Sequence, residues 1–138
     1  TFLTNHDQNR IMSRLGGPTP EGMAKAKAAA TVLFTLPGVP FMYYGEEIGM
    51  TGQKPDENIR TPMQWTAEPE RAGFSTASPW REVNGNTDVV NVAAQQADPD
   101  SLWTRYRDLI RVRGLRPSLG HGDVRTIDVG DDRVLAYE

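Results

Sequence analysis

The sequence predicts an α/β fold, because a strand, a helix and a second strand follow one another near its start. Residues 1–4 read as the end of a buried strand, and residues 39–44 form a continuous apolar run that Gly45 closes. Such runs are typical of parallel strands that are buried on both faces. Between them, residues 23–36 place apolar side chains at helical spacing. This order of elements indicates a right-handed βαβ unit.

The helix between the two strands has sequence signals at both ends. Thr19 supplies a capping hydroxyl, Pro20 suits the first helical position, and Glu21 adds an acid to the first turn. Pro37 and Gly38 end the helix. One face is expected to pack in the core, and it consists of Met23, Ala26, Ala30, Leu33 and Phe34.

After the second strand, the sequence predicts a long loop, then a second helix and then two short strands. Residues 46–97 are rich in Gly, Pro, Asn and Thr without a sustained period, so we expect a long, ordered loop, which in a compact domain is usually functional. A second helix is expected to start at residues 98–100 and to stop around Gly114. Residues 123–129 and 133–137 read as two short strands joined by a hairpin. We therefore divide the chain into residues 1–119, with α/β character, and residues 120–138, with β character.

Composition excludes several classes of function. The net charge of −3 leaves no basic surface for nucleic acid or for an anionic membrane. No apolar run approaches the ~20 residues that span a bilayer. Cysteine is absent, and the only histidines, His6 and His121, lie far apart, so no zinc-binding spacing is present. We predict no cofactor, and the composition leaves the cellular location open.

The strongest local candidate for a functional site follows the first strand. Residues 5–10 read Asn-His-Asp-Gln-Asn-Arg, and functional residues of parallel α/β folds lie at the carboxyl ends of strands. Asp7 could accept hydrogen bonds from a polar ligand, and His6 could donate one to a hydroxyl. An alternative of similar weight is a loop whose side chains only satisfy backbone groups.

The long loop holds weaker candidates. Glu46 and Glu47 are adjacent and so point to opposite sides of an extended segment, which favours a cap or an arginine partner over a catalytic pair. Arg60 could reach a substrate or simply lie in solvent, and its local sequence does not decide between the two. Three aromatic side chains could stack on sugar rings, but we expect them to anchor the loop to the core. They are Trp65, Phe74 and Trp80.

Taken together, five segments resemble the α-amylase family of glycosidases. Residues 2–10 are similar to the last conserved region of that family, and residues 38–50 to its eighth barrel strand and the following turn. Residues 60–65, which read Arg-Thr-Pro-Met-Gln-Trp, resemble the branch that acts on oligosaccharides. Residues 101–119 resemble the final barrel helix, and residues 123–138 the opening of the β domain behind the barrel.

The resemblance implies the last strands and helices of a (β/α)₈ TIM barrel, followed by the first strands of an all-β domain. Members cleave α-linked glucose oligosaccharides by a retaining double displacement. Asp7 matches the acid that orients the sugar at the transition state, His6 matches a histidine that binds sugar hydroxyls, and Arg60 matches an arginine that holds the terminal glucose. Calcium is common in the family, but its usual ligands lie upstream, so no metal is expected here.

The same resemblance places the nucleophile and the acid/base upstream of this chain. We therefore expect a piece of a longer retaining α-glycosidase that is inactive alone. Two of eight strands cannot close a barrel, so we also expect self-association to cover the apolar faces and strand edges. The runner-up interpretation is a non-catalytic sugar-binding or protein-interaction module of the same fold. An unrelated α/β domain is a third.

Overall fold

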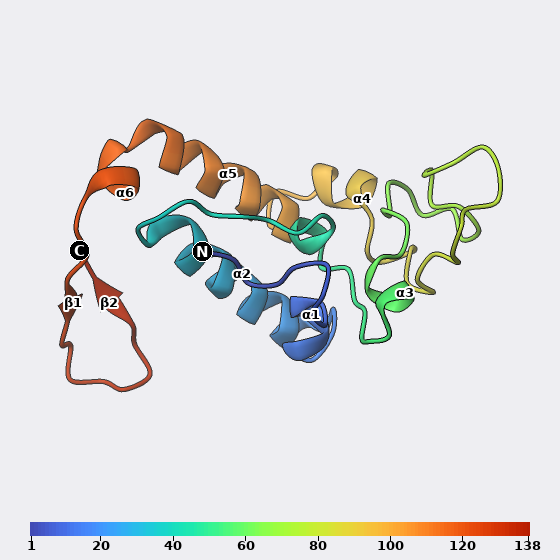
Figure 1. The fold of residues 1–138 in the computed structure, drawn as a ribbon. Helices are drawn as coiled ribbons and strands as arrows, with labels where there is room; N and C mark the ends of the chain where they lie inside the picture. Colours follow the sequence, from blue (N-terminus) through green and yellow to red (C-terminus); the bar gives the residue numbers. More distant parts are fainter.

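A computed structural model describes all residues, 1–138. Two long helices lie side by side, an irregular loop region occupies one end of the molecule, and a small hairpin extends from the other (Figure 1). The helical elements are α1 (Ile11–Arg14), α2 (Pro20–Thr35), the 3₁₀ helix η1 (Glu46–Ile48), α3 (Asp56–Ile59), α4 (Val92–Ala97), α5 (Leu102–Leu115) and α6 (Pro117–His121), and the strands are β1 (Thr126–Ile127) and β2 (Ala136–Tyr137).

Helix α2 confirms the sequence-based expectation. The Thr19 hydroxyl accepts a hydrogen bond from the Gly22 amide at 3.1 Å, and Pro20 occupies the first helical position. Four of the five side chains on the predicted apolar face are buried and Met23 is partly buried. This face packs on α5, where the rings of Phe34 and Tyr106 meet edge to face with centroids 5.6 Å apart.

The two expected strands are largely absent, which corrects the prediction. Residues Phe2 and Phe41 form one isolated parallel bridge, with the Phe41 amide donating to the Thr1 carbonyl at 2.8 Å. The expected burial is also wrong, because Val39 is 66% exposed and Phe41 63% exposed. A strand in a parallel sheet is buried by its neighbours, and these two segments have only each other.

The second helix begins later than predicted. Its N-cap is Ser101, whose hydroxyl accepts from the Thr104 amide at 3.1 Å, so α5 starts at Leu102. The carboxylate of Asp98 instead accepts from the Asp100 amide at 2.8 Å and forms a turn. Gly114 lies inside α5 rather than at its end.

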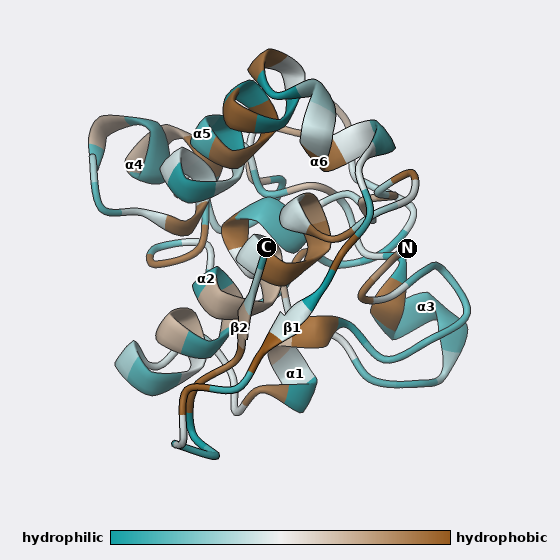
Figure 2. Cartoon of the chain, turned by 90° about the vertical axis from the view of Figure 1, so that its left-hand side faces the viewer, coloured by the Kyte–Doolittle hydropathy of each residue, from teal (hydrophilic) through white to brown (hydrophobic).

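The loop of residues 46–97 is irregular but contains three short helices, η1, α3 and α4, that the sequence did not predict. A second core holds it in place, in which Trp103 of α5 packs against buried residues of the loop. The buried residues of this second core are Ile48, Met50, Met63, Val90 and Val92. In Figure 2 the ribbon around α3 is mainly hydrophilic, whereas α5 carries both hydrophilic and hydrophobic stretches.

The C-terminal hairpin confirms the expected pair of strands, although they are shorter than predicted. β1 and β2 pair antiparallel, with Thr126 opposite Tyr137 and Ile127 opposite Ala136. The hairpin extends away from the two long helices (Figure 1) and meets α2 through a hydrogen bond between the hydroxyls of Tyr137 and Thr35.

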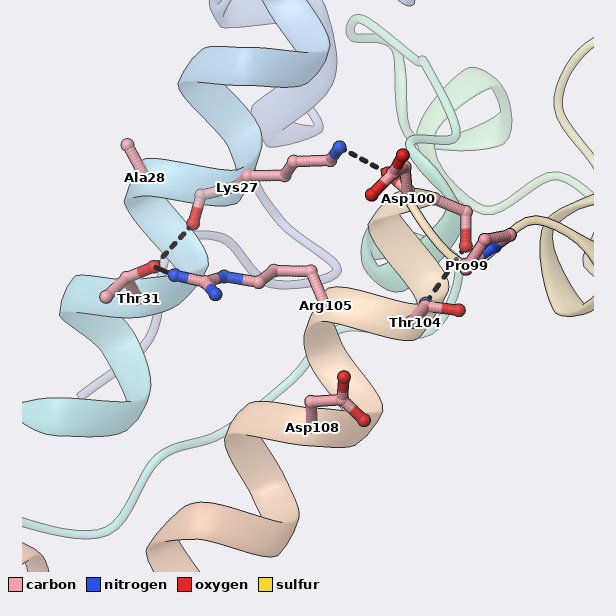
Figure 3. A pocket seen from close by; sticks show the side chains of 9 residues that line it. Lys27, Ala28, Thr31, Pro99, Asp100, Thr104, Arg105 and Asp108 are labelled. Carbon is pink, nitrogen blue, oxygen red and sulfur yellow. Dashed lines mark hydrogen bonds between the residues drawn. The ribbon is translucent and has the colours of Figure 1, made fainter.

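A polar groove of about 350 Å³ lies between α2 and the start of α5 (Figure 3). Arg105 donates to the Thr31 hydroxyl at 2.9 Å, and Lys27 donates to the Asp100 carbonyl. These bonds join α2 to α5 and to the turn before it, and none of the candidate site residues lines the groove. None of the helices is long and apolar enough to cross a membrane.

Candidate functional site

The three residues singled out in the sequence lie together. The Nε of Arg60 donates to the His6 carbonyl at 3.0 Å, and its Nη2 donates to Asp7 Oδ1 at 2.9 Å. The His6 Nε2 lies 3.4 Å from Asp7 Oδ2. The chain therefore brings together, at one exposed surface, side chains that are more than 50 positions apart in sequence.

A fourth member of this cluster, Asp56, was missed in the sequence. Its Oδ2 accepts from the same Nη2 of Arg60 at 2.7 Å, and its other oxygen accepts from Lys54. These contacts hold the pKa of Asp56 below its ordinary value, with Lys54 as the larger cause and Arg60 as a smaller one. Asp56 and Arg60 are four positions apart on α3, a spacing that brings opposite charges together on a helix.

The cluster is open to solvent. The exposed fractions of the side chains are 65% for His6, 61% for Asp7 and 38% for Arg60. Exposed ion pairs add little stability, ~0–1 kcal/mol. The arrangement therefore contributes little to holding the fold and leaves its polar side chains open to solvent.

Two tyrosines fix the backbone on both sides of Arg60. The Tyr43 hydroxyl donates to the Ile59 carbonyl at 3.0 Å, and the Tyr44 hydroxyl donates to the Thr61 carbonyl at 2.7 Å. Burial raises the pKa of Tyr43 to about 12, so its hydroxyl remains a donor at neutral pH. The end of the second apolar run thus holds the backbone on both sides of Arg60.

The two acids after this segment occupy different environments. Glu46 is 3% exposed and accepts from the Tyr106 hydroxyl at 2.9 Å and the Thr4 hydroxyl at 3.3 Å. Burial raises its pKa from 4.5 to about 7. Glu47 is half-buried, and its buried Oε2 has no hydrogen-bond partner. Neither acid forms an ion pair with an arginine, so of the two expected roles the arginine partner is wrong, whereas both acids do lie in the first turn of η1.

The three loop aromatics do not anchor the loop to the core, contrary to the sequence-based preference. Trp65, Phe74 and Trp80 are between 46% and 63% exposed. With Arg60 they line a cavity of about 410 Å³. The loop is anchored instead by Gln64, which is fully buried and whose Nε2 donates to the Val90 carbonyl at 2.7 Å. Because Gln64 is polar, the pattern of apolar residues in the sequence does not indicate that it anchors the loop.

No group of three or more histidine or acidic side chains lies close enough to hold a metal ion.

Comparison with known proteins gives the family. The family model of the α-amylase catalytic domain matches residues 1–122. The chain is 37% identical to α-amylase 3 of Dictyoglomus thermophilum, covering 99% of this chain and 26% of the relative. It is 34% identical to an oligo-1,6-glucosidase of Halalkalibacterium halodurans, covering 99% and 31%. It thus spans about a quarter to a third of the length of the curated relatives it matches.

Solved structures agree with the sequence relatives. A trehalulose synthase from Pseudomonas mesoacidophila superposes with a TM-score of 0.85 at 34% identity, covering 99% of this chain and 31% of the other. An isomaltulose synthase from Erwinia rhapontici, solved with sucrose, gives a TM-score of 0.85 at 31% identity, covering 99% and 31%. The fold is thus that of part of a TIM-barrel glycosidase.

The chain belongs to the α-amylase family, whose members include glycoside hydrolases such as α-glucosidases and oligo-1,6-glucosidases.

Proposed function

We propose that this chain carries part of the sugar-binding site of a retaining α-glycosidase that acts on α-linked glucose oligosaccharides. Asp7 is the acid that orients the sugar at the transition state, and His6 and Arg60 bind its hydroxyl groups. The observation that carries the proposal is the exposed cluster of these three residues, held by Arg60 bonds of 2.9 and 3.0 Å. The relatives include an oligo-1,6-glucosidase and a glucan 1,6-α-glucosidase, which supports this substrate class.

We further propose that the chain alone does not hydrolyse its substrate. Retaining hydrolysis needs two carboxyl groups about 5 Å apart, with the glycosidic bond between them. The only other acid in the cluster is Asp56, and both carboxylates bind the same Nη2 of Arg60. The guanidinium group therefore fills the space between them, and no residue of the chain is assigned as nucleophile or acid/base.

Sugar binding by the 138-residue chain tests the proposed site. Isomaltose or maltose titrated into the isotopically labelled chain should shift the NMR signals of His6 and Asp7, with a Kd on the order of 10 mM for so open a site. Replacing Arg60 with lysine should weaken binding about tenfold, because lysine cannot donate two bonds from a planar fork.

Arg81→Lys is the matched control for this titration. Arg81 lies in the same loop, and its Nη2 donates to Asn58 at 2.6 Å outside the cluster. Its replacement should leave sugar binding unchanged. Sugars that cause no saturable shift in the unmodified chain, or that bind equally well to Arg60→Lys, would count against the proposed function.

We also propose that residues 1–119 belong to the barrel and residues 120–138 to the start of the following β domain. The separate position of the β1–β2 hairpin supports this division (Figure 1).

Self-association is the third part of the proposal. The bridged segments expose a row of apolar side chains: Phe2 is 50% exposed, Val39 66%, Phe41 63% and Met42 39%. Their outer backbone edges have no partner strand in the chain, and such edges pair with other chains. A second copy that adds its own bridged segments would cover both the apolar row and the open edges.

Light scattering on a sizing column should therefore give a dimer or larger assembly. Phe41→Lys should shift it towards monomer, because a charge would have to be buried in the interface. Leu115→Lys is the control, since Leu115 is similarly exposed, at 66%, but lies at the end of α5. A monomeric parent chain that unfolds cooperatively would overturn this part of the proposal.

A non-catalytic binding module of the same fold is the second candidate function. The single observation in its favour is that Arg60 occupies the space between the two clustered carboxylates. Both candidate functions predict that this chain binds sugar. Neither predicts that this chain, without further residues, hydrolyses it.

A further inference from the structure

Arg10 is a buried arginine that the proposed function does not use. It is 2% exposed, yet it forms no ion pair within 4.0 Å. Its Nη1 donates to the Tyr44 carbonyl at 2.6 Å, and its Nε and Nη2 have no partner. Burying a charge in this way costs free energy unless other contacts compensate, so the position calls for an explanation.

The Arg10 guanidinium lies against two aromatic rings. Its central carbon lies 4.5 Å from the ring centroid of Tyr43 and 4.6 Å from that of Tyr44. The two rings themselves meet edge to face at 4.8 Å. Cation–π contacts of this kind are attractive, and more so when the cation is withdrawn from water. The guanidinium therefore contacts both rings and favours their present orientation.

The far ends of the same two rings hold the backbone around Arg60. Their hydroxyls bind the carbonyls of Ile59 and Thr61, the residues immediately before and after it. A ring that turns away from Arg10 would withdraw its hydroxyl from that carbonyl. The buried guanidinium and the exposed one are thus connected through two rigid side chains.

The backbone of Arg10 ties the same regions together. Its amide donates to the Gly52 carbonyl at 2.9 Å, and the neighbouring Asn9 accepts from the Lys54 amide at 2.8 Å. The loop that leads to α3 is therefore joined to the segment that carries His6 and Asp7.

We propose that Arg10 is a positioning residue for Arg60: through Tyr43 and Tyr44 it sets the place of the Arg60 guanidinium relative to His6 and Asp7. Arg10 does not touch the sugar. The effect of Arg10 on sugar binding rests on the proposed function, whereas the effect of Arg10 on the position of Arg60 is independent of it. The competing explanation is that Arg10 only stabilises the fold, in which case its loss would affect the whole chain evenly.

The exchange of the Arg60 Nε proton with water separates these explanations, because that proton is bound to the His6 carbonyl. It is measured by NMR in two variants. The double variant Tyr43→Phe with Tyr44→Phe keeps both rings and removes both hydroxyls, and Arg10→Lys keeps the charge and removes the planar group. Exchange should become about fivefold faster in both, the effect of losing one hydrogen bond, and sugar affinity should fall by a similar factor.

Tyr106→Phe is the matched control, since it removes a buried hydroxyl that binds Glu46 rather than the backbone around Arg60. It should leave exchange of the Arg60 proton unchanged relative to the backbone amides of α2 and α5. Arg60 exchange that stays the same in the double variant, or that rises only in step with those amides, overturns the proposal. If the parent chain binds no sugar while the Arg60 proton responds as expected, the proposed function fails and the positioning role stands.

Discussion

Replacing Leu33 with alanine should lower the free energy of unfolding by about 3 kcal/mol. Leu33 is 1% exposed and lies in the core between α2 and α5. The loss combines the transfer free energy of the removed methyl groups with the cavity left behind, because Ala30 and Leu109 cannot close the space without moving the helices. Urea denaturation at a fixed protein concentration measures the change.

Val112→Ala is the control for this variant. Val112 lies on the same helix as Leu109 but is 46% exposed, so its replacement should change the free energy of unfolding by less than about 0.5 kcal/mol. Equal effects of the two substitutions would mean that α2 and α5 do not pack in solution as they do in the structure.

The stability of the chain should fall as the pH rises through neutrality, because of Glu46. Its pKa is about 7 in the folded chain and 4.5 as an ordinary carboxyl. Between these values the folded state holds a proton that the unfolded state has released, so the free energy of unfolding decreases with increasing pH. The full contribution is present below about pH 4.5 and is lost through about pH 7, a change of ~3 kcal/mol.

The groups around Glu46 set both the size and the sign of this effect. Burial is the largest cause of the raised pKa, Glu47 adds to it, and Tyr106, Thr4 and Arg10 oppose it. The pKa of Glu47 is raised as well, so it contributes in the same direction. Exposed acids with a lowered pKa, such as Asp56, contribute in the opposite direction and at lower pH.

The variant Glu46→Gln isolates this contribution, because the amide oxygen can still accept from Tyr106 but carries no charge. Urea denaturation should find it more stable than the parent at pH ~8, by ~3 kcal/mol at most, and similar to it at pH ~4.5. Glu70→Gln, at an exposed position, should follow the parent at both pH values. A parent chain whose stability is the same on both sides of neutrality would refute the raised pKa.

The local elements of the fold could be predicted from the sequence, and the elements that depend on neighbours could not. Helix α2 was predictable because Thr19, Pro20 and an apolar face are all local signals. The apolar run of residues 39–44 was misleading, because strand burial depends on partners that the local sequence does not contain. The start of α5 was misassigned because Asp98 and Ser101 are both good caps, and only tertiary packing decides between them.

In the candidate site too, some residues could be predicted from the sequence and others depend on the tertiary fold. The place of His6 and Asp7 after a predicted strand indicates these two residues, the family resemblance adds Arg60, and the structure places the three in contact. Asp56 was missed although it precedes Arg60 by four positions, a spacing that could have indicated the pair. Arg10 carried no such signal, because a buried arginine between two aromatic rings is produced by the tertiary fold alone.

The most direct test of the proposed function is hydrolysis of a chromogenic α-glucoside by the purified 138-residue chain. We expect no release of the chromophore above the rate in buffer, because Asp7 and Asp56, the two acids of the cluster, both bind the Nη2 of Arg60. Release that rises in proportion to the protein, and that disappears in Asp7→Asn, would contradict the proposal that this chain binds α-linked glucose without cleaving it.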